Sequence, residues 1–111
     1  MVSYPYAADA GNACLLRTTV GDEDRARLLA KSLVGPKLAA CVHIYPVRSF
    51  YSWQGASKDE PEWVVEARVP TWLRRHRVKK AMLAGHPYEL PMVEMVGTTV
   101  THAYRAWMKR G

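Results

Sequence analysis

The chain has few cysteines and no long apolar run, and each of these scarcities excludes a class of protein. Its 111 residues include only two cysteines, Cys14 and Cys41, too few for the disulfide framework of a small secreted domain. No stretch approaches the roughly 18 apolar residues of a membrane-spanning helix, and the first residues lack the pattern of a signal peptide. We therefore expect a cytoplasmic protein with no membrane association, whose cysteines remain thiols.

Local signatures of catalysis are also missing from the sequence. It contains no Gly-x-Ser-x-Gly, no His-Glu-x-x-His and no glycine-rich phosphate loop. Its acidic residues are scattered over separate predicted elements rather than paired by local spacing. We therefore expect a protein that is not an enzyme.

Positive charge is abundant, with a formal net charge of +6. Much of it lies in one run, Arg74-Arg75-His76-Arg77-Val78-Lys79-Lys80. Such a run could attract phosphates, nucleic acid or an acidic partner, but a solvated helix face is the simpler interpretation. No aromatic residue interrupts the run, as stacking on single-stranded nucleic acid would require, so we do not expect nucleic acid as a partner.

The pattern of apolar residues predicts an orderly alternation of strands and helices. The predicted strands are 14–20, 38–53, 62–69 and 88–99, and the predicted helices are 23–34, 70–84 and 103–109. An N-cap at Asp22 and the breakers Gly35-Pro36 bound the first helix, and residues 54–61 read as a hairpin loop. Because Pro46 cannot donate a ladder hydrogen bond, it predicts an edge, a bend or a bulge.

The resulting order, β-α-β-β-α-β with a C-terminal helix, is that of the α+β ferredoxin-like split βαβ fold with an antiparallel sheet. Residues 12–111 fit a single domain that follows a flexible tail at 1–11. Helices over one face leave the other face of the sheet bare, and a long hairpin with Trp53 and Trp63 would expose apolar surface and strand edges. We therefore expect a homo-oligomer.

Two segments carry most of the side chains that could bind a metal ion. The first runs Leu38-Ala39-Ala40-Cys41-Val42-His43-Ile44-Tyr45-Pro46 and continues as Ser49-Phe50-Tyr51-Ser52-Trp53-Gln54-Gly55. Cys41 and His43 are two residues apart on a predicted strand, so both should project from the same face. The second segment is His86-Pro87-Tyr88-Glu89-Leu90-Pro91-Met92-Val93.

These segments resemble the motifs of the CutA family of divalent-cation tolerance proteins, and the resemblance spans about residues 15–108. It implies a ferredoxin-like homotrimer of PII-like architecture, built through paired strands of neighbouring subunits, that binds copper or similar metal ions. It further implies metal ligands at Cys41, His86 and Met92. His43 and Met92 stand where the family pattern has Asn and, often, Glu.

The chemistry of these side chains can be judged without the resemblance. Thiolate, imidazole and thioether form a soft ligand set that suits Cu(I) better than Zn(II) or a hard cation. His43 could join Cys41 on one ion because the two share a face.

Each candidate ligand also has a structural interpretation. Cys41 could be a small buried hydrophobe, His86 a turn or interface residue whose ring satisfies a backbone carbonyl, and Met92 a core or interface filler. A different function also stays open, namely a PII-like sensor that binds a small anionic ligand in clefts between subunits.

Overall fold

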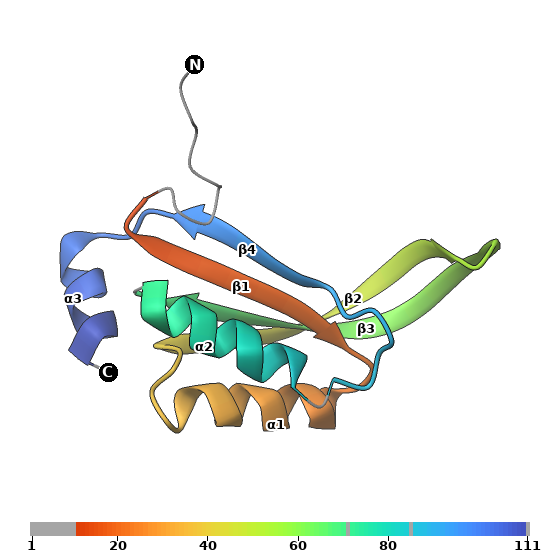
Figure 1. Cartoon of the computed structure of the whole chain (residues 1–111), viewed down its shortest axis with the longest axis horizontal. Helices are drawn as coiled ribbons and strands as arrows, with labels where there is room; N and C mark the ends of the chain where they lie inside the picture. Colours follow the sequence, from red (N-terminus) through yellow and green to blue (C-terminus); the bar gives the residue numbers. More distant parts are fainter. Residues whose placement is uncertain (1–10, 71, 85, 111) are drawn as a thin grey trace, which may run out of the picture.

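The computed structural model describes residues 11–70, 72–84 and 86–110. Two helices cover one face of a four-stranded antiparallel sheet, and a third helix lies at one end (Figure 1). The elements in chain order are β1 (Ala13–Val20), α1 (Glu23–Val34), β2 (Cys41–Trp53), β3 (Ala56–Val69), α2 (Trp72–Leu83), β4 (Val93–Thr98) and α3 (His102–Arg110). The predicted ferredoxin-like α+β fold is confirmed, whereas the predicted tail lies, except for Gly11, outside the described residues.

The strands lie in the order β2-β3-β1-β4. All three pairings are antiparallel, so β2 and β4 form the two edges of the sheet within one chain. The edge position of β2 accommodates Pro46, which pairs with Trp63 and leaves the strand continuous. The interpretation of Pro46 as an edge residue is therefore confirmed.

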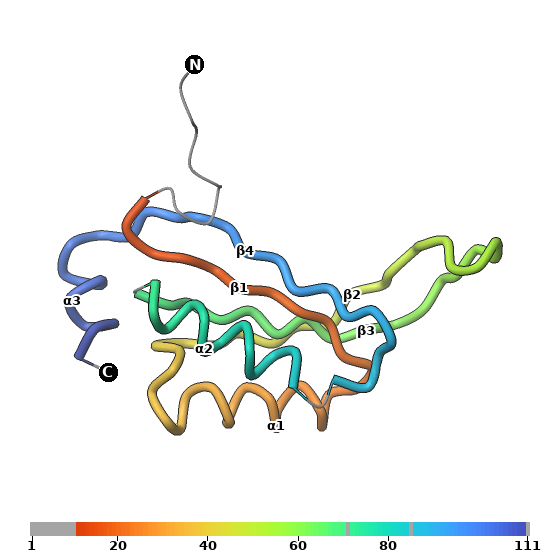
Figure 2. The backbone as a smooth tube through the Cα atoms, in the orientation of Figure 1, coloured from red at the N-terminus to blue at the C-terminus, as the bar shows by residue number. Residues whose placement is uncertain are grey.

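The β2–β3 hairpin is longer and its turn tighter than the sequence predicted. Gln54 and Gly55 both have positive φ, at 50° and 80°, and they join Trp53 to Ala56 in a two-residue turn. The predicted loop at 54–61 is therefore wrong from residue 56 onward. Beyond the end of β1 at Val20, the hairpin projects from the body of the molecule (Figure 2).

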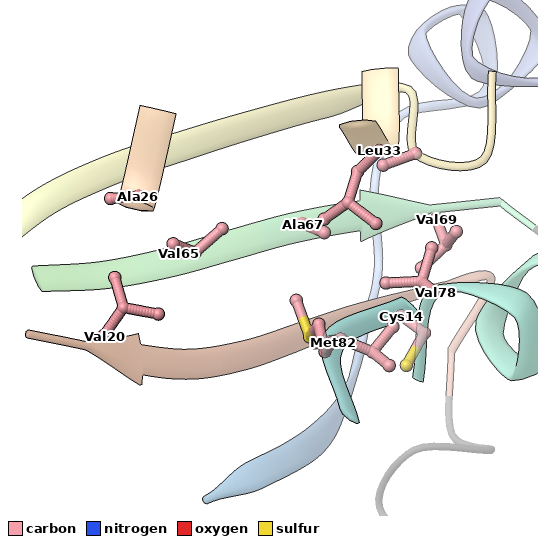
Figure 3. Close-up of a cluster of buried hydrophobic side chains, with 11 residues drawn as sticks. Cys14, Val20, Ala26, Leu33, Val65, Ala67, Val69, Val78 and Met82 are labelled. Carbon is pink, nitrogen blue, oxygen red and sulfur yellow. The ribbon is translucent and has the colours of Figure 1, made fainter. Parts of the chain in front are cut away.

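The core lies between the sheet and the two covering helices (Figure 3). Asp22 caps α1 by accepting a hydrogen bond from the Arg25 backbone N–H at 2.8 Å, and the helix then buries Ala26 and Leu33. Helix α2 buries Val78 and Met82, one turn apart. Part of the basic run is thus a structural helix face.

Two arginine side chains connect helix α3 to the rest of the chain through hydrogen bonds to backbone carbonyl oxygens. Arg105 donates to the carbonyl oxygens of Asn12 at 2.6 Å and Pro70 at 3.4 Å. Arg74 of α2 donates to the carbonyl oxygen of Met108 at 3.1 Å, which places one member of the basic run in a helix contact. The fully buried Met108 side chain anchors the same helix by packing.

Candidate functional site

The register of the strands decides which side chains share the uncovered face of the sheet. On β2, Val42 and Ile44 pack against the core on the side of the helices. Because side chains alternate along a strand, Cys41 and His43 project from the opposite face. Their partners across the strand pair are Arg68 and Glu66. We call Cys41, His43, Glu66 and Arg68 the open-face cluster.

Cys41 and His43 lie side by side, as their spacing predicted. The Cys41 Sγ atom is 3.6 Å from His43 Nε2, with the thiol partly exposed and the imidazole exposed. A thiol and an imidazole at this separation are close enough to contact one soft metal ion. Among residues 11–70, 72–84 and 86–110, no group of three or more His, Cys, Asp or Glu side chains is placed to hold a metal ion.

A chain of charged contacts continues from this pair across the sheet. His43 Nδ1 is 2.9 Å from Arg68, which also lies 3.2 Å from Glu66 Oε1. The other carboxylate oxygen, Oε2, accepts from Arg17 at 2.6 Å and from Tyr45 at 2.9 Å. Glu66 is thus the centre of a network to which His43 is attached only through Arg68.

The charge of Glu66 is maintained although the side chain is 7% exposed. Burial alone would raise its pKa, but the hydrogen bonds from Arg17 and Tyr45 and the charges of Arg17 and Arg68 outweigh burial and lower the pKa. Burial, together with the bond to this carboxylate, raises the pKa of Tyr45. The network therefore holds a carboxylate and a neutral phenol at neutral pH.

His86 lies on the other side of the sheet and is fully engaged there. Its Nε2 is 3.0 Å from the carbonyl oxygen of Thr19 and 3.3 Å from Oγ1 of Thr18, a buried side chain on the helix side. Its Nδ1 accepts from the Tyr88 backbone N–H at 3.2 Å. These are the contacts of a turn residue that satisfies backbone groups, which was the structural interpretation of His86.

Met92 lies far from Cys41 within one chain. It immediately precedes β4, whereas Cys41 begins β2, and the two strands are opposite edges of the sheet. Three interstrand spacings of about 4.8 Å separate those edges. The structure therefore brings Cys41 and His43 together, and it places His86 and Met92 elsewhere in the single chain.

Two features beside His86 were missed by sequence reasoning. The Tyr88 hydroxyl donates to Glu62 at 2.7 Å, which ties the segment after α2 to the base of the projecting hairpin. Burial, followed by this bond, strongly raises the pKa of Tyr88. The other feature is a cavity of about 420 Å³ between α1 and α2, lined by residues that include Leu28, Leu29 and His86.

Neither feature could be predicted from a local sequence pattern, because each joins segments that are distant in the sequence. Glu62 and Tyr88 are 26 residues apart, and the cavity combines two helices with the turn at 86–87.

The fold and this face define a class, namely small ferredoxin-like α+β proteins with a projecting hairpin and a sheet face left free by the helices. Comparison with known proteins gives the particular family. Residues 14–111 match the family described as CutA1 divalent ion tolerance protein. The chain belongs to this family, as its motifs predicted.

Individual relatives agree with this assignment. The divalent-cation tolerance protein CutA of Thermus thermophilus is 35% identical over 91 residues, which cover 81% of this chain and 85% of the relative. The solved structure of CutA from Synechococcus elongatus superposes with a TM-score of 0.84 at 34% identity, covering 91% of this chain and 90% of that one. That structure and this chain therefore share the fold over nearly their whole lengths.

A more distant structure shares the same fold. It is described as the periplasmic divalent cation tolerance protein CutA from Archaeoglobus fulgidus, and it superposes with a TM-score of 0.82 at 24% identity, covering 88% of this chain and 96% of that one. At that identity the likeness establishes the fold alone. Within the part of the chain that the structure describes, no helix is long and apolar enough to cross a membrane. The cytoplasmic location stays a prediction.

Proposed function

We propose that this chain takes part in the tolerance of divalent cations, the role stated in the names of its relatives, by binding copper or a similar soft metal ion. The ion would be held at Cys41 on the open face of the sheet. The observation that carries this proposal is the partly exposed Cys41 thiol on the open face, with His43 Nε2 3.6 Å from its Sγ atom. Thiolate ligands select Cu(I) over harder ions, which favours copper in its reduced state.

The same proposal includes assembly into a homotrimer through paired strands. The helices cover only one face of the sheet, and the projecting hairpin carries Phe50 at 73% exposed and Tyr51 at 42% exposed. Exposed aromatic side chains beside an unpaired strand edge favour burial against a second copy. In such an assembly Met92 of a neighbouring copy, which is 40% exposed in the single chain, could add a second soft ligand to an ion at Cys41.

Sedimentation at micromolar protein concentration tests the assembly. We expect a single species with three times the mass of the chain. A stable monomer at that concentration would contradict this part of the proposal.

A binding role is proposed rather than a catalytic one. The two buried carboxylates in the described part of the chain are already engaged: Glu66 by Arg17, Tyr45 and Arg68, and Glu62 by Tyr88. Groups held in this way stabilise structure and are poorly placed to transfer protons to a substrate. The contacts thus support the expectation of a non-enzymatic protein.

Titration with Cu(I) under reducing conditions, against a competing chelator, tests the metal site. We expect the Cys41→Ser variant to bind at least about tenfold more weakly than the wild type, because it loses the soft ligand. The matched control is Cys14→Ala, which removes the other thiol, 5% exposed and on the helix side of the sheet. Equal binding by the wild type and Cys41→Ser would exclude Cys41 as the metal ligand.

A further inference from the structure

The contact between Arg68 and His43 fixes where the imidazole carries its proton. A guanidinium group has five N–H donors, has no acceptor and stays charged in proteins. At 2.9 Å from this group, His43 Nδ1 must therefore accept a hydrogen bond. An imidazole that accepts at Nδ1 is neutral and carries its hydrogen on Nε2, which is the nitrogen that faces Cys41 Sγ at 3.6 Å.

This arrangement is the reverse of the one found around metal-binding histidines. A ligating imidazole offers the lone pair of one nitrogen to the ion and donates the N–H of the other to a carboxylate, a carbonyl or water. In this chain the nitrogen beside the thiol carries the hydrogen, and the other nitrogen faces a donor. Coordination through Nε2 would require the hydrogen to move to Nδ1, where it would point at Arg68.

Displacing Arg68 from His43 would also disturb the rest of the network. The same guanidinium lies 3.2 Å from Glu66 Oε1, and the Arg68 side chain is only 25% exposed. Glu66 is itself held through Oε2 by Arg17 at 2.6 Å, so it offers Arg68 a fixed partner. Arg68 is therefore held in place from the side away from His43.

We propose that Arg68 determines the metal specificity of this face by keeping His43 out of the coordination of an ion at Cys41. The ion would be bound by sulfur, while the His43 Nε2–H group donates a hydrogen bond to that sulfur. Soft ions that bind thiolate strongly, such as Cu(I), would be retained, whereas Zn(II), which needs further nitrogen or oxygen ligands, would be bound poorly. The statement about ions rests on the proposed function, but the statement about the His43 tautomer does not.

The first part of the test is a long-range proton–nitrogen NMR correlation on the metal-free protein, which reports the tautomer of His43 directly. We expect the Nε2–H form in the wild type. In Arg68→Leu the donor to Nδ1 is lost, and we expect a mixture of the two neutral tautomers. The control is Arg17→Leu, which removes another arginine from Glu66 and should leave the His43 signal unchanged. A wild-type ring with its hydrogen on Nδ1 would overturn the inference.

The second part measures Zn(II) affinity with the nitrogen shifts of His43 as the readout. Changes in the groups around a metal ligand typically alter affinity by about 10–100-fold, so we expect Arg68→Leu to bind Zn(II) at least about tenfold more tightly than the wild type. The gain should be accompanied by a shift of the Nε2 signal, and it should disappear in the double variant Arg68→Leu/His43→Asn.

The outcomes separate the inference from the proposed function. If Cu(I) binds through Cys41 but Arg68→Leu gains no affinity for Zn(II), Arg68 does not control specificity and the inference fails alone. If no Cu(I) binding depends on Cys41, the proposed metal site fails, and the claim about specificity fails with it.

Discussion

Two histidines of this chain lie on opposite faces of one sheet, and their surroundings differ in kind. His86 contacts the backbone at both ring nitrogens, donating to Thr19 and accepting from Tyr88. His43 is exposed, and among the described residues its ring nitrogens contact only side chains, those of Cys41 and Arg68. Backbone partners are fixed by the fold, whereas side chains can change rotamer. The comparison indicates that His86 stabilises the chain, whereas His43 is positioned by side chains and contributes little to stability.

Replacement of each histidine by alanine tests this difference and should give the largest effect. His86→Ala loses two hydrogen bonds and the edge contact with the Tyr88 ring at 4.8 Å, so we expect a loss of about 2–3 kcal/mol in the free energy of unfolding. His43→Ala should change it by less than about 0.5 kcal/mol, as is usual for an exposed position. Urea unfolding at a fixed protomer concentration measures both, and equal losses would refute the distinction.

On the face that carries His43, the position of Arg68 depends on its ion pair with Glu66, which substitution of Glu66 removes. Glu66→Gln leaves Arg17 and Arg68 without their shared carboxylate, and we expect a loss of about 2 kcal/mol at pH 7, moderated because both arginines are partly exposed. Glu94→Gln is the control, since its carboxylate is 51% exposed and 3.4 Å from Arg17. A loss no larger than that of the control would show that the network contributes little.

The pH dependence of stability checks the same carboxylate. The pKa of Glu66 in the folded chain lies below its ordinary value of 4.5, so Glu66 contributes stability above that pH. This contribution is lost as the pH falls below 4.5 and through the folded pKa. Wild-type stability should therefore fall more steeply than that of Glu66→Gln between about pH 5 and pH 3. Parallel curves would contradict a lowered pKa.

A smaller effect is expected on the His86 side, at Tyr88. Tyr88→Phe keeps the aromatic ring and the backbone N–H that donates a hydrogen bond to His86. It removes only the hydroxyl group that donates to Glu62 at 2.7 Å. We expect a loss of about 1–2 kcal/mol. Because the pKa of Tyr88 is raised, this contribution is present below pH 10 and is lost as the pH rises toward the folded pKa. A variant as stable as the wild type at pH 7 would mean that the bond contributes nothing.

Most of the fold could be predicted from the sequence because the relevant signals are local. The period of two in β2 placed Cys41 and His43 on one face, and the cap at Asp22 marked the start of α1. The β2–β3 turn was misplaced because the outer hairpin projects beyond the core. With both of its faces exposed, residues 56–61 show no alternation of apolar and polar side chains, and their charges resemble a loop.

The arrangement of the candidate ligands could be predicted only in part. The separation of His86 from Cys41 depends on where residues 86–87 lie against the helices, and no periodic pattern encodes that position. The contact of Arg68 with Glu66 follows from their spacing of two on β3, but its contact with His43, 25 positions away, depends on the register of β2 against β3. Register follows from the packed sheet rather than from any local motif.

The central claim is that the ion contact of this chain lies at Cys41 on the open face and not at His86 of the same chain. A crystal structure of the protein grown with Cu(I) under reducing conditions tests it most directly. We expect copper at Cys41 Sγ with a bond of about 2.3 Å, the length of thiolate–zinc bonds, and His86 still bound to Thr19. Copper on His86 with Cys41 left free would contradict the account.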